Sequence, residues 1–196
     1  MDIDTIRDFV NLKLEEGAEI KRQRIAEHVS ELLQGHALMD KLRKCLATFD
    51  EMGYYGRSKD QVQMHNRMLA ALAKLIYGPK VFDRYKREIM HYNGFIQISS
   101  FLACTLPRRE GKTISLAQLI TVLLLLLPFI KIAFVTNNMG NGELMTAKVQ
   151  EFLAVVFNKA EKSELPFNNK RKIHLRHDGN ECAKFMAFSG QGNPNK

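Results

Sequence analysis

The stretch "TLPRREGKTISLAQ", Thr105–Gln118, decides how this sequence is interpreted, because the tripeptide Gly111–Thr113 has the ending of a phosphate-binding loop. The usual loop reads G-x-x-x-x-G-K-[ST], which would place a glycine at position 106. This sequence has Leu106 there, followed by Pro107 and two arginines. The tripeptide is therefore a chance match, a damaged nucleotide site, or a variant loop whose differences carry information.

The segments on either side of the tripeptide favour a variant loop. The run "SFLACTL", which ends at Leu106, is continuously apolar, as a buried parallel strand requires. A helix is predicted from about Thr113 through the leucine run to Pro128, which cannot continue a helix. A strand that leads directly into a helix presents backbone N–H groups and the positive end of the helix dipole to a polyanion.

Each residue of the tripeptide has a physical role in such a site. Gly111 allows the backbone to approach a phosphate closely, Lys112 would reach the β- and γ-phosphates, and the hydroxyl of Thr113 would ligate Mg²⁺. The alternative is an ordinary strand-to-helix turn in which Lys112 is a solvated cap.

The residues before the tripeptide add rigidity and charge. Pro107 fixes one φ angle, and Arg108 and Arg109 add two permanent positive charges. Arg108 would stabilise the transferring phosphoryl group from within the same chain, as an arginine finger does in cis. The alternative is that both arginines bind nucleic-acid phosphate or face solvent.

Beyond Pro128 the pattern alternates between strands and helices. "KIAFVT" (131–136) is a predicted strand, and "ELMTAKVQEFLAVVF" (143–157) has helical spacing. "KIHLRH" (172–177) and "CAKFMAF" (182–188) flank an Asp-Gly turn and predict a hairpin. Strand, loop, helix, strand and helix form a βαβ unit, so the predicted fold is α/β of the P-loop NTPase type.

The first half of the chain is predicted to be helical, because apolar residues recur at helical spacing from Ile3 to about Met90. Ser58 or Asp60 is a candidate cap for a helix over 61–77. Interruptions are predicted at Gly35-His36, in the loop from Glu51, at Gly78 and at the Asn93-Gly94 turn. We therefore expect a helical N-terminal region over 1–80 and an ATPase-type domain over 81–196.

A family resemblance is carried by "LPRREGKT", which resembles the modified nucleotide loop of viral terminase large subunits. These are the ATPases that drive double-stranded DNA into preformed capsids, and the P-R-R-x-G-K-T pattern is most similar to the herpesvirus branch. The following helix, the strand "KIAFVTNN" and the next helix resemble the family's order of elements, and "KFMAFSGQGNPN" is similar to the segment before its acidic motif. The resemblance covers Phe82 to the C-terminus.

The resemblance implies an ASCE-type ATPase fold with ATP and Mg²⁺ as ligands, in a motor that moves DNA during virion assembly. The implied partners are double-stranded DNA, other terminase subunits and the capsid portal, with an oligomeric ring only for the full-length protein. Arg108 takes the place of the family's catalytic loop arginine, and Thr113 is the metal ligand. The implied nucleotide-binding residues are Pro107, Arg108, Arg109, Glu110, Gly111, Lys112 and Thr113.

Two departures from the family pattern limit what the resemblance implies. Where terminases carry an aromatic–glutamine pair that recognises adenine, this sequence reads Tyr85-Lys86, and lysine lacks the paired donor and acceptor of glutamine. ATP hydrolysis also needs an acid at the end of a second apolar strand. The acids after Thr113 are Glu143, Glu151, Glu161, Glu164, Asp178 and Glu181, and none follows an apolar strand.

The missing acid suggests an incomplete ATPase domain. "CLATFDE", which ends in Asp50-Glu51, imitates the acidic motif but precedes the loop, and we interpret it as a helix end. The acidic strand and the family's nuclease domain are expected downstream, as for a first exon, a truncated reading frame or a fragment. Such a chain is expected to bind ATP weakly and not to hydrolyse it.

Composition fits an intracellular globular protein. Of 196 residues, 45% are hydrophobic and 26% charged, and the net charge of +8 favours an anionic partner. The three cysteines form no C-x-x-C pair and are expected to be reduced thiols, and no secretory signal is visible. The apolar run Leu119–Ile130 is shorter than the roughly 20 residues needed to span a membrane. If the herpesvirus-like resemblance holds, the expected location is the host nucleus.

Two other classes of function stay open at this point. The chain can be an independent small P-loop enzyme such as a nucleotide kinase, which would need its own magnesium-binding acid and an arginine-rich lid. It can also be a non-catalytic interaction protein whose helical half binds a partner. Stabilisation by ATP that depends on Lys112 would exclude the last of these.

Overall fold

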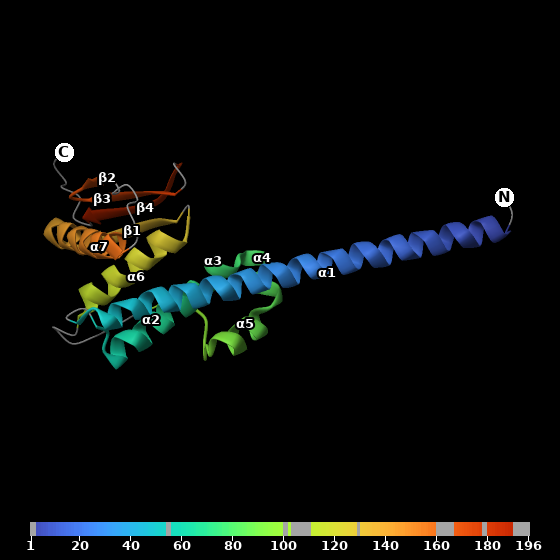
Figure 1. The fold of residues 1–196 in the computed structure, drawn as a ribbon, viewed down its shortest axis with the longest axis horizontal. Helices are drawn as coiled ribbons and strands as arrows, with labels where there is room; N and C mark the ends of the chain where they lie inside the picture. The colour runs from blue at the N-terminus through green and yellow to red at the C-terminus, as the bar shows by residue number, and fades with distance from the viewer. Residues whose placement is uncertain are drawn as a thin grey trace. The chain divides into compact units, whose positions relative to one another are not determined.

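The computed structural model of the chain describes residues 3–53, 56–99, 102, 111–128, 130–159, 167–177 and 180–189. The architecture is mixed α/β and mostly helical, with one four-stranded sheet (Figure 1). The chain divides into two compact units that are interleaved in sequence. Unit 1 comprises 1–39 and 69–101, and unit 2 comprises 40–68 and 102–196. The functional assignment of 1–80 and 81–196 to separate regions stays a prediction.

Unit 1 consists of helices. It holds most of α1 (Ile3–Ala47) together with α3 (Ala73–Tyr77), α4 (Pro79–Arg84) and α5 (Lys86–Asn93). Gly78, at φ 77°, separates α3 from α4, and Gly94, in the left-handed region, ends α5. Both glycines therefore confirm interruptions that the sequence predicts.

The predicted break at Gly35-His36 is wrong, because α1 continues through both residues. A glycine costs a helix about 1 kcal/mol, which is less than tertiary packing can return. At this position a Cβ atom would overlap the ring of Tyr77, so the glycine allows close packing of α1 against α3. Conversely, the helix predicted over 61–77 is divided at Leu72, and the helical pattern between Gly78 and the Asn93-Gly94 turn is divided at Tyr85. The hydrophobic spacing gives no break signal at either position.

Unit 2 contains the sheet and the helices that cover it. After the end of α1 come the 3-10 helix η1 (Thr48–Glu51) and α2 (Lys59–Ala71), of which 59–68 belongs to this unit. The second stretch holds two long helices and four strands: α6 (Lys112–Leu126), β1 (Lys131–Thr136), α7 (Met139–Lys159), β2 (Phe167–Asn169), β3 (Lys172–His177) and β4 (Asn180–Ser189).

The sheet has the order β1-β4-β3-β2, in which β1 and β4 are parallel and the other pairs are antiparallel. The helix from about Thr113, the strand at 131–136 and the hairpin are therefore confirmed. The helix predicted from Glu143 begins earlier, at Met139. The strand predicted before the loop lies almost entirely outside the described residues.

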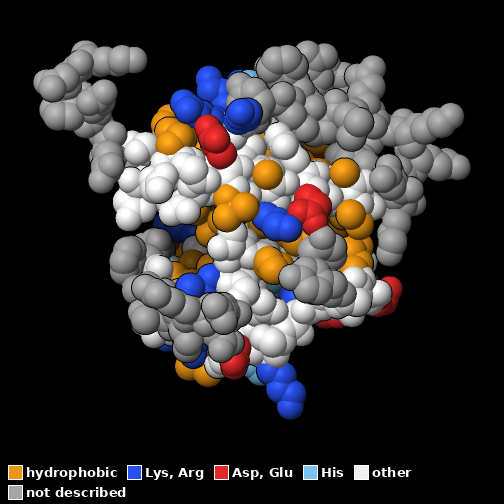
Figure 2. Space-filling view, turned by 90° about the vertical axis from the view of Figure 1, so that its left-hand side faces the viewer, with side chains coloured by type: hydrophobic (Ala, Val, Ile, Leu, Met, Phe, Trp, Pro, Cys, Tyr) orange, Lys and Arg blue, Asp and Glu red, His pale blue; other side chains and the backbone are white. Residues whose placement is uncertain are grey.

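The core of unit 2 lies between the sheet and two helices. Figure 1 shows α6 and α7 on the same side of the sheet. After its first turn α6 is buried almost continuously, and the Phe49 and Phe152 rings meet edge to face with centroids 5.1 Å apart. Hydrophobic side chains also reach the molecular surface in small patches between charges of both signs (Figure 2). Within the described ranges, no helix combines the length and apolarity needed to cross a membrane.

Candidate functional site

The N-terminal end of α6 carries the tripeptide on which the sequence analysis depends. Gly111 precedes the helix in the left-handed conformation, with φ 69° and ψ 21°, and its carbonyl accepts the first helical hydrogen bond from the Ser115 N–H at 2.9 Å. No side chain among the described residues caps this end. Lys112 and Thr113 are exposed in the first turn, so this helix begins with a positive charge and a hydroxyl.

The other two α-helices that begin in unit 2, α2 and α7, are each capped by a side chain of the residue before them. At the start of α2 the Ser58 hydroxyl accepts a hydrogen bond from the Gln61 N–H at 3.3 Å, and the Gln61 side-chain oxygen accepts one from the Ser58 N–H at 2.8 Å. This reciprocal pair is a capping box, and it confirms Ser58 as the predicted cap. At the start of α7, Asn138 Oδ1 accepts a hydrogen bond from the Gly140 N–H at 2.8 Å.

The capping box of α2 also reaches Gly111. Gln61 Nε2 lies 3.5 Å from the Gly111 carbonyl oxygen, and a Cβ on Gly111 would overlap that Nε2 atom. The left-handed backbone is therefore the main reason for glycine at position 111, and a larger residue would also make the flexible Gln61 side chain move aside.

A second contact from α2 fixes the next residue of the α6 turn. His65 is 1% exposed, and its Nε2 atom lies 2.8 Å from the Ser115 carbonyl oxygen. A carbonyl can only accept a hydrogen bond, so Nε2 carries the proton. The other ring nitrogen, Nδ1, then accepts from Arg57 at 3.4 Å. The neutral imidazole therefore satisfies both of its neighbours.

Burial is the main reason that His65 is neutral. Desolvation lowers the pKa of His65 below its ordinary value of 6.5, and the positive charge of Arg57 lowers it further. The hydrogen bond to Ser115, which is the second largest cause, and the charge of Asp50 raise the pKa but do not offset the effect of burial. The histidine is therefore a structural hydrogen-bonding group at neutral pH rather than a charge near the tripeptide.

Arg57 joins this contact to the end of α1. Its guanidinium, only 8% exposed, binds both carboxylate oxygens of Asp50, at 2.7 Å from Nε and 2.6 Å from Nη2. The side-chain hydrogen bonds from Arg57 are the main reason that the pKa of Asp50 is lowered. Asp50 thus belongs to a 3-10 turn after α1, as the helix-end interpretation predicts, and its carboxylate is engaged by Arg57.

The predicted site residues are only partly covered by the structure. Gly111, Lys112 and Thr113 lie together at the start of α6, whereas Pro107, Arg108, Arg109 and Glu110 lie outside the described residues. Tyr85 and Lys86 lie at the junction of α4 and α5 in unit 1. The groups that sequence reasoning missed are Arg57, Gln61 and His65, and of these only Gln61 had a signal, the S-x-x-Q pattern.

The described strands carry polar residues, but no acids, at their carboxyl ends. β1 ends at Thr136, which is paired in parallel register with Ser189 at the end of β4, and Asn138 follows β1. Two of the acids considered above lie on α7 instead: Glu143 lies 3.3 Å from Arg171, and Glu151 lies 2.7 Å from Lys148. Neither carboxylate therefore follows a strand.

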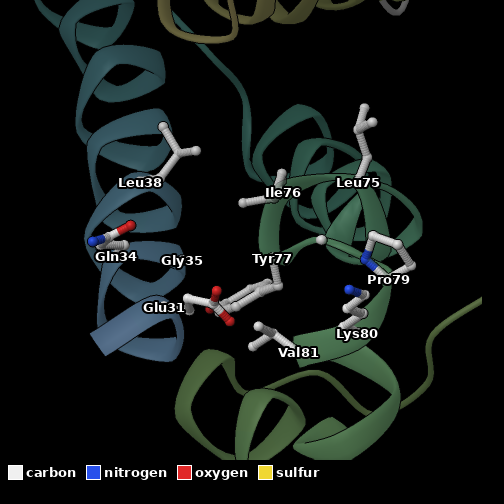
Figure 3. Close-up of a pocket in the computed structure, with 11 residues that line it drawn as sticks. Glu31, Gln34, Gly35, Leu38, Leu75, Ile76, Tyr77, Pro79, Lys80 and Val81 are labelled. Atoms are coloured by element: carbon white, nitrogen blue, oxygen red, sulfur yellow. The ribbon is translucent and has the colours of Figure 1, made fainter. Parts of the chain in front are cut away.

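A pocket of about 550 Å³ in unit 1 is a second concave feature (Figure 3). Its lining combines one side of α1 with α3 and α4, and includes Glu31, Gln34, Leu38, Tyr77, Pro79 and Lys80. The Tyr77 ring points toward α1. Its hydroxyl is engaged by His36 and by Asn93, both at 2.8 Å, so this polar group of the lining serves the fold. The pocket is therefore a weaker candidate than the start of α6.

The comparisons with known proteins assign no family. The sequence matches no protein-family model, and no curated protein is significantly similar to it.

Proposed function

We propose that the start of α6 binds the phosphates of a nucleoside triphosphate, with ATP and Mg²⁺ as ligands. The observation that carries the proposal is the contrast among helix starts in unit 2. α2 and α7 are each capped by a side chain of the residue before them, whereas α6 begins with a left-handed glycine, no side-chain cap among the described residues, and a lysine. A lysine at this end of a helix is unfavourable to the helix dipole, and a bound anion would offset that cost.

The residues present fit such a ligand. Backbone N–H groups of the first turn of α6 precede the first helical hydrogen bond and are suited to phosphate oxygens. Lys112 would neutralise phosphate charge, and Thr113 would hold Mg²⁺ through its hydroxyl. Mg²⁺ held there would supply positive charge that offsets the charge of the phosphates. Arg108 would stabilise the transferring phosphoryl group.

The resemblance of "LPRREGKT" to terminase loops supports a more specific proposal. The chain would be the ATP-binding part of a terminase large subunit, in a P-loop fold of the ASCE type. Its partners would be double-stranded DNA, other terminase subunits and the capsid portal, in the host nucleus. Because β1 and β4 end in Thr136 and Ser189, the chain is expected to bind ATP without turning it over.

Thermal unfolding with and without MgATP tests nucleotide binding. Saturation at about 100 times Kd adds about 2.7 kcal/mol to the free energy of unfolding. That is about 5 to 10 °C in Tm for a chain of this size. Lys112→Ala is expected to abolish the shift, whereas Lys131→Ala, an exposed lysine of β1, is expected to retain it.

Two results would contradict the proposal. Equal stabilisation of the wild type and Lys112→Ala by MgATP would place the nucleotide elsewhere. Robust Mg²⁺-dependent hydrolysis by the 196 residues, lost in Lys112→Ala, would point to an independent P-loop enzyme instead of a motor fragment.

A further inference from the structure

The sheet of unit 2 has two faces of different chemistry. Side chains that are register partners point to the same face, so the pairings assign each residue to one of them. Among the side chains that the structure describes, one face packs against α6 and α7 and is apolar except for the pair Thr136 and Ser189 at its end; its apolar members are Ile132, Phe134, Ile173, Leu175, Ala183, Phe185 and Ala187. The opposite face, called here the outer face, is defined by eight described side chains: Lys131, Ala133, Val135, Lys172, His174, Lys184, Met186 and Phe188.

The outer face is accessible to a partner. Val135 is 68% exposed and its register partner Phe188 is 44% exposed. Lys131, Ala133 and Lys172 are also exposed. Exposure of an aromatic side chain beside a β-branched one, on a strand pair whose other face is a packed core, is unusual for a surface that meets only water.

The charges of the outer face all have one sign. It carries three lysines and a histidine, and none of its eight side chains is acidic. The register places Lys131, Lys184 and His174 in one row across three strands, and Val135 with Phe188 in a row at the other end. Met186 and Lys172, which are paired, lie between the two rows. A cationic row and an apolar row therefore lie four residues apart along the strands, on the same face.

We propose that the outer face binds an unpaired nucleic-acid strand. Its phosphates would contact Lys131, Lys172 and Lys184, and a base would stack on the exposed ring of Phe188 beside Met186. Cationic side chains along the backbone combined with aromatic platforms for the bases are the two requirements of single-strand binding. The net charge of +8 acts in the same direction.

Two other partners fit the outer face less well. An amphipathic helix that covered the face would bury Lys131 and Lys172, and removing lysine charges from water is costly. A duplex conceals the faces of its bases, so it would use the lysines but not Phe188.

Three consecutive basic residues, Lys170–Lys172, form a cluster at the start of the hairpin. Lys172 is on the outer face, whereas the Arg171 guanidinium lies 3.3 Å from Glu143 of α7. Lys172 is therefore a surface cation, whereas Arg171 of the same cluster forms an ion pair within the chain.

Fluorescence anisotropy with a labelled 20-residue oligodeoxythymidine tests the proposal on the full chain, without nucleotide. Lys131→Glu with Lys172→Glu is expected to weaken binding at least tenfold and to reduce the slope of log K against log salt by about 1.4. Phe188→Leu, which keeps an apolar side chain without an aromatic face, is expected to weaken binding about tenfold. A duplex of the same length is expected to bind more weakly than the single strand.

The matched control is Lys21→Glu with Arg24→Glu, two exposed residues of α1 that change the net charge equally. Circular dichroism checks that each variant is folded. Absence of binding by the wild type, equal weakening by the control pair, unchanged binding by Phe188→Leu, or tighter binding of the duplex would each overturn the proposal. None of these outcomes bears on ATP binding at α6.

Discussion

The helices α6 and α7 begin in opposite ways, although both belong to unit 2 and both cover the same side of the sheet. α7 begins after Asn138, whose side chain accepts the Gly140 N–H. α6 begins after Gly111, which has no such cap among the described residues. Side chains of α2 contact the carbonyl groups of Gly111 and Ser115, not the N–H groups of the first turn of α6. The difference suggests that the start of α7 is complete by itself, whereas the start of α6 is held in place for a ligand.

The largest expected effect follows from removal of the His65 contact. His65→Leu deletes the hydrogen bond to the Ser115 carbonyl and the contact with Arg57 in a buried site, at a cost of about 1–3 kcal/mol in the free energy of unfolding. MgATP affinity should fall too, because the first turn of α6 loses its support. Urea unfolding and nucleotide titration measure the two effects.

His65→Gln is the matched control, because its amide nitrogen can still donate to Ser115. It should recover most of the nucleotide affinity. If His65→Leu bound MgATP as tightly as the wild type, the contacts from α2 would not support the site.

Gly111→Ala is expected to have the next largest effect. A left-handed alanine costs about 1–2 kcal/mol, and its Cβ would also displace the Gln61 amide. Gly53 has a similar φ of 60° with nothing near a Cβ, so Gly53→Ala isolates the backbone cost. The loss of stability caused by Gly111→Ala in urea unfolding should be smaller when it is measured against Gln61→Ala than against the wild type, and an equal loss in the two backgrounds would refute the overlap.

Asn138→Ala tests the comparison of the two helix starts at α7. Loss of this cap should cost about 1 kcal/mol of stability, because the Gly140 N–H loses its acceptor. The affinity for MgATP should not change. A parallel loss of stability and nucleotide affinity would show that the two helix starts act together.

The smallest effect is a pH dependence of stability. His65 and Asp50 both have lowered pKa values in the folded state, so the unfolded state binds more protons as the pH falls. The contribution of His65 is fully present above its ordinary pKa of 6.5 and is lost as the pH falls through the lowered value. The contribution of Asp50 is lost only below its ordinary value of 3.8.

Denaturant unfolding between pH 7.5 and 5 measures the histidine contribution. The decline below pH 6.5 should be shallower in His65→Gln than in the wild type. An equal decline in the two proteins would assign the titration to another group.

Local patterns in the sequence predicted the elements around the candidate site. The leucine run and Pro128 gave α6, β-rich runs gave β1 and the hairpin, and Ser58 was recognisable as a cap. Asn138 could also have been recognised as a cap, which would have placed the start of α7 correctly.

Contacts distant in sequence could not be predicted in the same way. His65 and Ser115 are 50 residues apart, and a histidine in a polar helix gives no sign of burial. The close packing of Gly35 against the Tyr77 ring is such a contact, and no helix propensity encodes it. The interleaving of the two units could not be predicted for the same reason. Residues 40–68 belong to the same unit as α6 because of tertiary packing, although 69–101 separates them in the sequence.

Amide hydrogen exchange with and without MgATP tests the central claim most directly, because it compares the two helix starts in one sample. We expect MgATP to slow exchange at residues 111–115, at the start of α6, and to leave residues 139–142, at the start of α7, unchanged. Lys112→Ala should remove the protection. No protection at 111–115, or equal protection at both helix starts, would contradict nucleotide binding at α6.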